Sequence, residues 1–233
     1  MKSTIGKTCT ALGALALALT MTASLARAQS AYPPASLLAA QWWQWALSTP
    51  ASENPLLDTT GAFAAVNQHG RVWFLAGNLG GTTVRNINVP AGKALFFPIV
   101  NTFDVENGIA RHVEPAAGPG GTIVFMVKQP VQTAQAFVST IIATATGLSC
   151  TVDGSPLQIS AANLEQSTPF SVFLPANNIV GVPAGVYFPF VDSGYYVLLA
   201  PLSSGFHKIH FAGTEIFNGK PISQDVTYNI TVQ

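Results

Sequence analysis

The sequence predicts a mainly β protein: an antiparallel β-sandwich of the jelly-roll or immunoglobulin-like kind with two covering α-helices. Two observations predict this class. Most of the chain alternates short runs of β-branched and aromatic residues with Gly, Pro and Asn, which is typical of many short strands joined by turns. Only two stretches, near residues 35–48 and 131–146, depart from that pattern and carry helical features instead.

Ten segments carry the strand pattern. In chain order they are 71–76, 82–89, 93–100, 122–128, 149–152, 169–174, 186–191, 194–200, 207–212 and 225–232. The segments at 93–100 and 186–191 each follow a Val-Pro-Ala-Gly sequence and each contain a proline. Because proline cannot donate to a ladder, we expect both prolines at a sheet edge or a bulge.

The helix predicted near 35–48 holds three of the four tryptophans in the chain, Trp42, Trp43 and Trp45. The polar residues fall on a narrow arc of the helical wheel, and that arc holds Gln41, Gln44 and Ser48. A helix with so wide an apolar surface is typically buried. The indoles also point in different directions, so they do not form a flat platform for a sugar. We expect core packing with bonded indole N–H groups; contact with a glycan, a partner or a membrane is the alternative.

The second helix, near 131–146, has apolar residues at spacings of three and four from Ala134 to Ala145. Pro130 suits its first turn and Gly147 suits its C-terminal end. Such an amphipathic helix is expected to lie flat against a sheet or to cover an open end of the sandwich.

Residues 1–28 have the features of a secretory signal peptide. Lys2 and Lys7 precede an uncharged apolar run at 11–23, and the small residues of Ala-Arg-Ala at 26–28 suit cleavage after Ala28. The sequence therefore predicts an exported protein, periplasmic or extracellular, with a single sandwich domain over 29–233. No later run reaches the ~18 apolar residues of a membrane-spanning helix.

Charge is scarce, since charged residues make up only 9% of the chain. Removal of Lys2, Lys7 and Arg27 with the signal peptide leaves seven Lys and Arg against ten Asp and Glu, a net charge of −3. The absence of a basic patch argues against nucleic-acid binding and against attraction to anionic membranes. A surface of Asn, Gln, Ser and Thr suits neutral partners such as carbohydrate.

Catalytic signatures are missing from the sequence: it has no G-x-S-x-G, Walker loop, H-E-x-x-H or paired C-x-x-C. The densest group of ionisable residues lies in the segment 104–114, at Asp104, Glu106, Arg111, His112 and Glu114. Asp104 and Glu106 could supply oxygen ligands to Ca²⁺, the one cofactor that the sequence suggests. Asp104, Glu106 and His112 are also the candidate catalytic acids and bases. A solvated loop with local ion pairs is the structural alternative.

A second candidate site follows the turn at His69. Arg71 and Trp73 alternate onto one face of the predicted strand, where they could form a stacking floor with a charged rim for a sugar. Arg85 in the next strand could belong to the same face. Cation–π packing of Arg71 on Trp73 is the structural alternative.

Two further features are interpreted as structural. His207 and His210 are three positions apart on a strand, so their side chains point to opposite faces and make a poor metal pair. We expect His207 to be a hydrogen-bonded histidine at the core margin. Cys150 is the one cysteine left after processing, and we expect a buried thiol, because the residues beside it offer no base.

Several segments of the chain resemble a group of exported bacterial proteins of unassigned function. The segments that carry the resemblance are "WWQWALSTP", "NQHGRVWFLAG", "VPAGKALFFPIVN" and "GYYVLLAPLSSGFHKIHFAG" with the later "DVTYNITV". The resemblance covers most of the chain after the signal peptide. It implies export and a compact β fold, and it implies no activity, cofactor or site residue.

Two functional hypotheses remain from the sequence. The first is a non-catalytic protein that binds a neutral polymer such as a glycan, or another envelope protein. The second is a hydrolase-like enzyme that acts on an extracellular substrate through the 104–114 segment. Scarce charge, few histidines and no nucleophile signature favour the first hypothesis.

Overall fold

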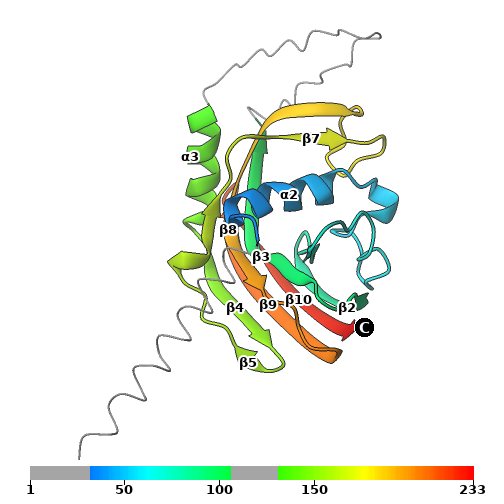
Figure 1. Cartoon of the computed structure of the whole chain (residues 1–233). Helices are drawn as coiled ribbons and strands as arrows, with labels where there is room; N and C mark the ends of the chain where they lie inside the picture. Colours follow the sequence, from blue (N-terminus) through cyan, green and yellow to red (C-terminus); the bar gives the residue numbers. More distant parts are fainter. Residues whose placement is uncertain (1–31, 106–130) are drawn as a thin grey trace, which may run out of the picture. The chain divides into compact units, whose positions relative to one another are not determined.

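Two stacked five-stranded sheets and two helices make up the part of the chain that the computed structural model describes, residues 32–105 and 131–233 (Figure 1). The sheets form a β-sandwich, so the predicted fold class is confirmed. Strand pairing is mostly antiparallel, as expected, but two of the described pairs are parallel: β1 with β3, and β2 with β10. The predicted strand at 122–128 and the predicted signal peptide lie outside the described residues.

The first sheet, here called sheet A, has the order β1-β3-β8-β6, and β7 also pairs with β8. Its strands are β1 (Val72–Phe74), β3 (Ala94–Val105), β6 (Leu164–Gln166), β7 (Phe170–Leu174) and β8 (Gly185–Leu199). β8 replaces the two separate strands predicted at 186–191 and 194–200. The intervening Asp192 and Ser193 continue the ladder with β3, so no turn separates the two runs.

Both strand prolines lie beside irregularities in the ladder, as predicted. The register between β3 and β8 shifts between Pro98 and Val100. The register between β7 and β8 shifts across the stretch of β8 that contains Pro189. Each shift accommodates a residue that has no backbone N–H to donate.

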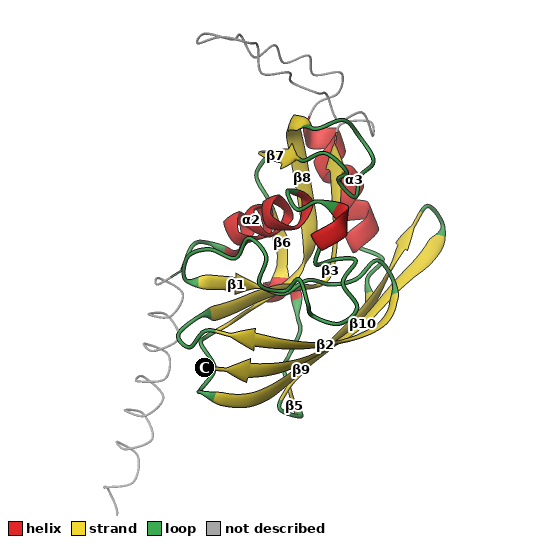
Figure 2. Cartoon of the chain, turned by 90° about the vertical axis from the view of Figure 1, so that its right-hand side faces the viewer, coloured by secondary structure: helices red, strands yellow, loops and turns green. Residues whose placement is uncertain are grey.

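The second sheet, sheet B, has the order β2-β10-β9-β4-β5, and its strands run side by side in Figure 2. These strands are β2 (Gly81–Val89), β4 (Thr146–Val152), β5 (Ser155–Pro156), β9 (Gly205–Phe217) and β10 (Lys220–Val232). β9 and β10 form a long hairpin that the predicted strands at 207–212 and 225–232 cover only in part. The final strand of the chain, β10, lies between β2 and β9.

The main core fills the space between the two sheets. The inward side chains of β3 contribute Leu95, Phe97 and Ile99, and those of β9 include Ile209 and Phe211. The rings of Phe97 and Phe211 stack with centroids 4.9 Å apart. Inward residues alternate with outward ones along each strand, and this period-2 alternation lets each sheet bury one face.

Helix α2 (Ala35–Leu47) covers part of sheet A, and the prediction that its tryptophans are buried is confirmed. Trp42, Trp43 and Trp45 are each at most 7% exposed. Each indole N–H donates a hydrogen bond, to the Leu75 carbonyl, the Asp192 carboxyl and the Val66 carbonyl respectively. The polar arc also has partners in β7, because Gln44 donates to the Ser171 carbonyl and Ser48 to the Phe173 carbonyl.

Helix α3 (Val131–Ile142) is shorter than the predicted 131–146. The chain turns at Ala143 and Thr144 and enters β4 at Thr146, so Gly147 lies within a strand, with a positive φ of 63°. Val138 and Ala134 pack against Val191 of β8. Helices α2 and α3 lie on opposite sides of β8 (Figure 1). None of the helices within the described ranges is long and apolar enough to cross a membrane.

Cys150 lies in the main core, where its side chain is 2% exposed. Burial raises the pKa of its thiol to about 12, so the reactive thiolate is not formed near neutral pH. We therefore expect the native chain without residues 1–28 to leave a thiol reagent unconsumed at pH 8, whereas the same chain unfolded in urea should react within minutes. Rapid labelling of Cys150 in the native state would contradict its placement in the core.

Candidate functional site

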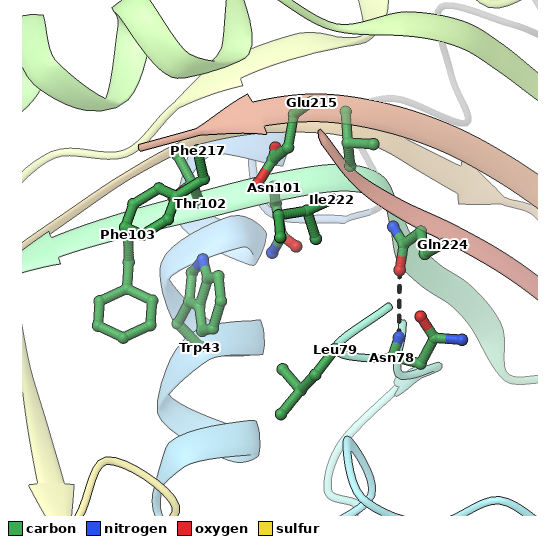
Figure 3. Close-up of a pocket in the computed structure, with 11 residues that line it drawn as sticks. Trp43, Asn78, Leu79, Asn101, Thr102, Phe103, Glu215, Phe217, Ile222 and Gln224 are labelled. Carbon is green, nitrogen blue, oxygen red and sulfur yellow. Dashed lines mark hydrogen bonds between the residues drawn. The ribbon is translucent and has the colours of Figure 1, made fainter. Parts of the chain in front are cut away.

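A pocket of about 390 Å³ opens where α2, β3 and the β9–β10 hairpin meet (Figure 3). Its apolar lining consists of Trp43, Leu79, Val100, Phe103, Phe217 and Ile222. Its polar lining consists of Asn78, Asn101, Thr102, Glu215 and Gln224. A largely apolar cavity of this size with a few polar groups is the usual form of a small-ligand site.

The pocket lies along a stretch of β3 that has no neighbouring strand on one side among the described residues. β1 pairs only with residues 94–96 of β3, so the ladder on that side stops at Phe96. Further along β3, the Ile99 carbonyl accepts a hydrogen bond from the side-chain amide of Gln224. The same Gln224 accepts one from the Asn78 backbone N–H at 3.1 Å. Gln224 thus joins β10 to β3 and to the loop at Asn78 within the pocket lining.

Glu215, on β9, is the one acidic residue among the described residues that line the pocket. It is only 8% exposed, and its Oε2 has no hydrogen-bond partner among the described residues. Burial raises the pKa of its carboxyl group from 4.5 to about 7. Figure 3 shows Glu215 and Asn101 directed toward the same space from β9 and β3. A buried carboxyl group without a partner is a marker of a functional site.

A second buried carboxyl group, that of Asp192 on β8, supports two walls of the pocket from behind. Its Oδ1 accepts from Trp43 Nε1 at 2.6 Å and from the Tyr196 hydroxyl at 2.7 Å. The Tyr196 oxygen in turn accepts from Asn101 Nδ2 at 2.9 Å. Burial raises the pKa of Asp192 to about 7, against the opposing effect of these hydrogen bonds. The chain of bonds fixes both the Trp43 ring and the Asn101 amide.

Asp104 does not reach the pocket. It is paired with Val191, which packs on α3, whereas the adjacent Phe103 is paired with Asp192 on the α2 side. Burial raises the pKa of Asp104, and its Oδ1 accepts from the Val105 backbone N–H. Glu106 and His112, the other candidate catalytic residues of the segment, lie outside the described residues. Within the described ranges, no three His, Cys, Asp or Glu residues gather as a metal site would require, so the calcium hypothesis at Asp104 and Glu106 stays untested.

The predicted sugar-stacking floor is not present at Trp73. This side chain is 6% exposed and belongs to the core between the sheets, so its ring offers no surface to a ligand. Arg85 is buried as well, at 1% exposed, instead of lining a rim. Arg71 and His69 are exposed. The strand alternation identified the face that Trp73 occupies, but that face is the inner one.

Arg85 has a structural role at the margin of the core. Its guanidinium donates to the carbonyl oxygens of Asp58, Ala76 and Gly77 and to the hydroxyl of Tyr228, at 2.6–2.9 Å. Its Cζ also lies 5.3 Å from the centre of the Tyr228 ring. Arg85 therefore ties the loops on either side of β1 to sheet B.

His207 forms a cluster with Asp153 and Ser203 that has the composition of a Ser-His-Asp triad. His207 Nδ1 lies 2.8 Å from Asp153 Oδ2, and Nε2 lies 2.9 Å from the Ser203 carbonyl oxygen and 3.3 Å from its Oγ. Because carboxylate and carbonyl oxygens only accept, both ring nitrogens donate in this geometry, as in a charged imidazolium. Ser203 consequently has no free base beside it, and the cluster is a structural one at the sheet margin, as predicted for His207.

This cluster predicts a pH-dependent stability. The Asp153 hydrogen bond raises the pKa of His207 above 6.5, and the same bond lowers the pKa of Asp153 below 3.8. The His207 contribution is complete below pH 6.5 and is lost as pH rises through the raised value; the Asp153 contribution is lost as pH falls through the lowered one. We expect His207→Gln to reduce the free energy of unfolding more at pH 5.5 than at pH 8.5, as measured by urea denaturation. Equal losses at the two pH values would refute this assignment.

The sequence did not single out Glu215, which lines the pocket, or Asp192, which holds two of the lining side chains from behind. Each is the one acidic residue of its strand. One signal could have found Glu215: the alternation that places Ile209 and Phe211 inward continues through Gly213 to Glu215. The alternation could not have shown that α2 and β3 meet at that position.

Comparisons with models of known protein families, with curated proteins and with solved structures find no match to this chain. The proposed function therefore rests on the pocket alone.

Proposed function

We propose that this chain is a non-catalytic binding protein of the periplasm or the cell exterior, and that the pocket between α2, β3 and the β9–β10 hairpin receives one group of a larger ligand. The ligand is the end of a neutral glycan or a side chain of another envelope protein. Either would place an apolar surface against the aromatic lining and a hydrogen-bond donor beside Glu215.

The observation that carries the proposal is the unpartnered Oε2 of Glu215 in an otherwise apolar pocket. A buried acceptor without a donor costs about 1–3 kcal/mol. A ligand that donates a hydrogen bond to this oxygen removes the cost, and its binding is favoured by that amount. The Asp192 hydrogen bonds hold Trp43 and Asn101 in place before a ligand arrives, which lowers the entropy lost on binding.

A glycan array and a pull-down from an envelope extract, each with the chain lacking residues 1–28, test the proposal. The expected result is a ligand that raises the melting temperature, because it binds only the native state. Glu215→Gln is expected to abolish or strongly weaken this binding. The matched control is Glu165→Gln, which makes the same chemical change in a carboxyl group outside the pocket. A ligand whose binding survives Glu215→Gln and Phe217→Ala unchanged would show that the pocket is not the site.

The hydrolase-like enzyme remains the second candidate, and one feature favours it: Glu215 is buried in the pocket, which raises the pKa of its carboxyl group to about 7, a value suited to a general acid near neutral pH. Under this hypothesis Glu215, and not the 104–114 segment alone, would donate a proton to the leaving group. A panel of chromogenic glycosides and esters tests it. Turnover that disappears in Glu215→Gln and follows the ionisation of one group near pH 7 would support the enzyme and overturn the non-catalytic proposal.

A further inference from the structure

We infer that the group bound in this pocket is a primary ammonium on an apolar stem, of the kind found in a lysine side chain or an alkylamine. The inference rests on the proposed binding function and specifies the ligand chemistry. It follows from which hydrogen-bonding atoms of the lining are already used and which are free.

Each amide of the lining uses at least one of its side-chain N–H groups within the protein. Asn101 Nδ2 donates to the Tyr196 hydroxyl, and Gln224 Nε2 donates to the Ile99 carbonyl. Asn78 Nδ2 donates to the Gly81 carbonyl and the Thr83 hydroxyl, both at 2.9 Å. The orientation of the Asn101 amide is fixed, because the Tyr196 hydroxyl donates its proton to Asp192 and can therefore only accept from Asn101.

Two acceptors of the lining are available to a ligand that donates. The Glu215 carboxyl group has its unpartnered Oε2, and Asn101 presents Oδ1, since its Nδ2 is bound to Tyr196. Among the described residues of the lining there is no Lys, Arg or His to neutralise an ionised Glu215. A ligand carboxylate or phosphate would meet the like charge of that carboxylate, so the pocket discriminates against anions.

An ammonium fits this set better than a hydroxyl does. An ammonium offers three donors, whereas a neutral hydroxyl offers one. It also supplies a positive charge to pair with the ionised Glu215 carboxylate. The aromatic lining of Trp43, Phe103 and Phe217 can cover the apolar stem and attract the cation through ring faces. Leu79 and Ile222, 64% and 39% exposed, extend the apolar surface at the rim.

The test compares two probes of the same shape, n-hexylamine and n-hexanol, by calorimetry and by chemical-shift changes at pH 8.5. A charge-assisted hydrogen bond predicts that the amine binds about 10–100-fold more tightly than the alcohol. Glu215→Gln should remove this preference, and Glu165→Gln should keep it. Because Glu215 must be ionised, affinity for the amine should fall on going from pH 8.5 to 5.5 in the wild type and stay level in Glu215→Gln.

Each outcome is decisive. Equal binding of amine and alcohol, or a preference for the amine that survives Glu215→Gln, overturns the inference. If neither probe binds, the inference is also wrong. The glycan array tests the proposed function separately, because a neutral glycan that binds at Glu215 would support that function without an amine. Thermal melting of Glu215→Gln verifies folding, and Asn101→Leu, which removes the other acceptor, provides a second variant that should also weaken amine binding.

Discussion

Arg85→Met is expected to lower the free energy of unfolding by about 3 kcal/mol or more, since each buried acceptor left without a donor costs about 1–3 kcal/mol. The substitution preserves the apolar stem but removes every donor that Arg85 supplies to three carbonyl oxygens and to the Tyr228 hydroxyl. The Ala76 carbonyl retains one donor, the Tyr228 hydroxyl, at 2.8 Å. Urea denaturation monitored by tryptophan fluorescence measures the loss.

The neighbouring Val84→Ala serves as the control, because Val84 is 50% exposed on the same strand. It should change the stability by less than about 1 kcal/mol. If Arg85→Met were equally mild, the loops on either side of β1 would not depend on the guanidinium, and the role given to Arg85 would be wrong.

Trp42→Ala is expected to cost about 3–5 kcal/mol, the range for deleting a large aromatic side chain from a core. Trp42 is fully buried and its ring lies edge-on to Trp43 and Trp45, with centroids 4.8 and 6.1 Å away. Its indole also donates to the Leu75 carbonyl, which would lose its partner. The measurement is again the free energy of unfolding in urea.

Leu37→Ala on the same helix is the matched comparison, since Leu37 is 46% exposed. Its cost should be a small fraction of the Trp42 cost. Comparable losses at the two positions would mean that the burial of Trp42 adds nothing specific, and the tryptophan cluster would not anchor α2.

Local patterns in the sequence were sufficient for the elements that depend on neighbours in the chain. The apolar arc of α2 and the stripe of α3 predicted two helices, and the β-branched runs predicted most strands. The parallel pairing of β2 with β10 was not predictable, because it joins residues such as Asn86 and Asn229 that are far apart in the sequence. The sequence also predicts an end of α3 that is too far along the chain, because Gly147 resembles a helix stop but lies in β4.

The candidate site was harder to predict, because density of charge was a misleading guide. The 104–114 segment contains five ionisable residues. Asp104, the one of them that the structure describes, lies on the α3 side of sheet A. Glu215 and Asp192 are each the one acid of their strand, and their importance depends on burial that comes from the tertiary packing of the sheets and helices. The expectation that Trp73 and Arg85 line a ligand surface was wrong because both side chains are buried. Strand alternation shows that residues share a face but not which face is covered.

The central position of β10 in sheet B determines when the sandwich can be completed. β2 pairs with β10 and with no other described strand, so a chain shortened before Lys220 would leave β2 without a ladder. The β9–β10 hairpin can form locally, but docking of β2 must close a loop of more than a hundred residues, which is slow. A chain synthesised from its N-terminus therefore stays incompletely folded until its last strand emerges.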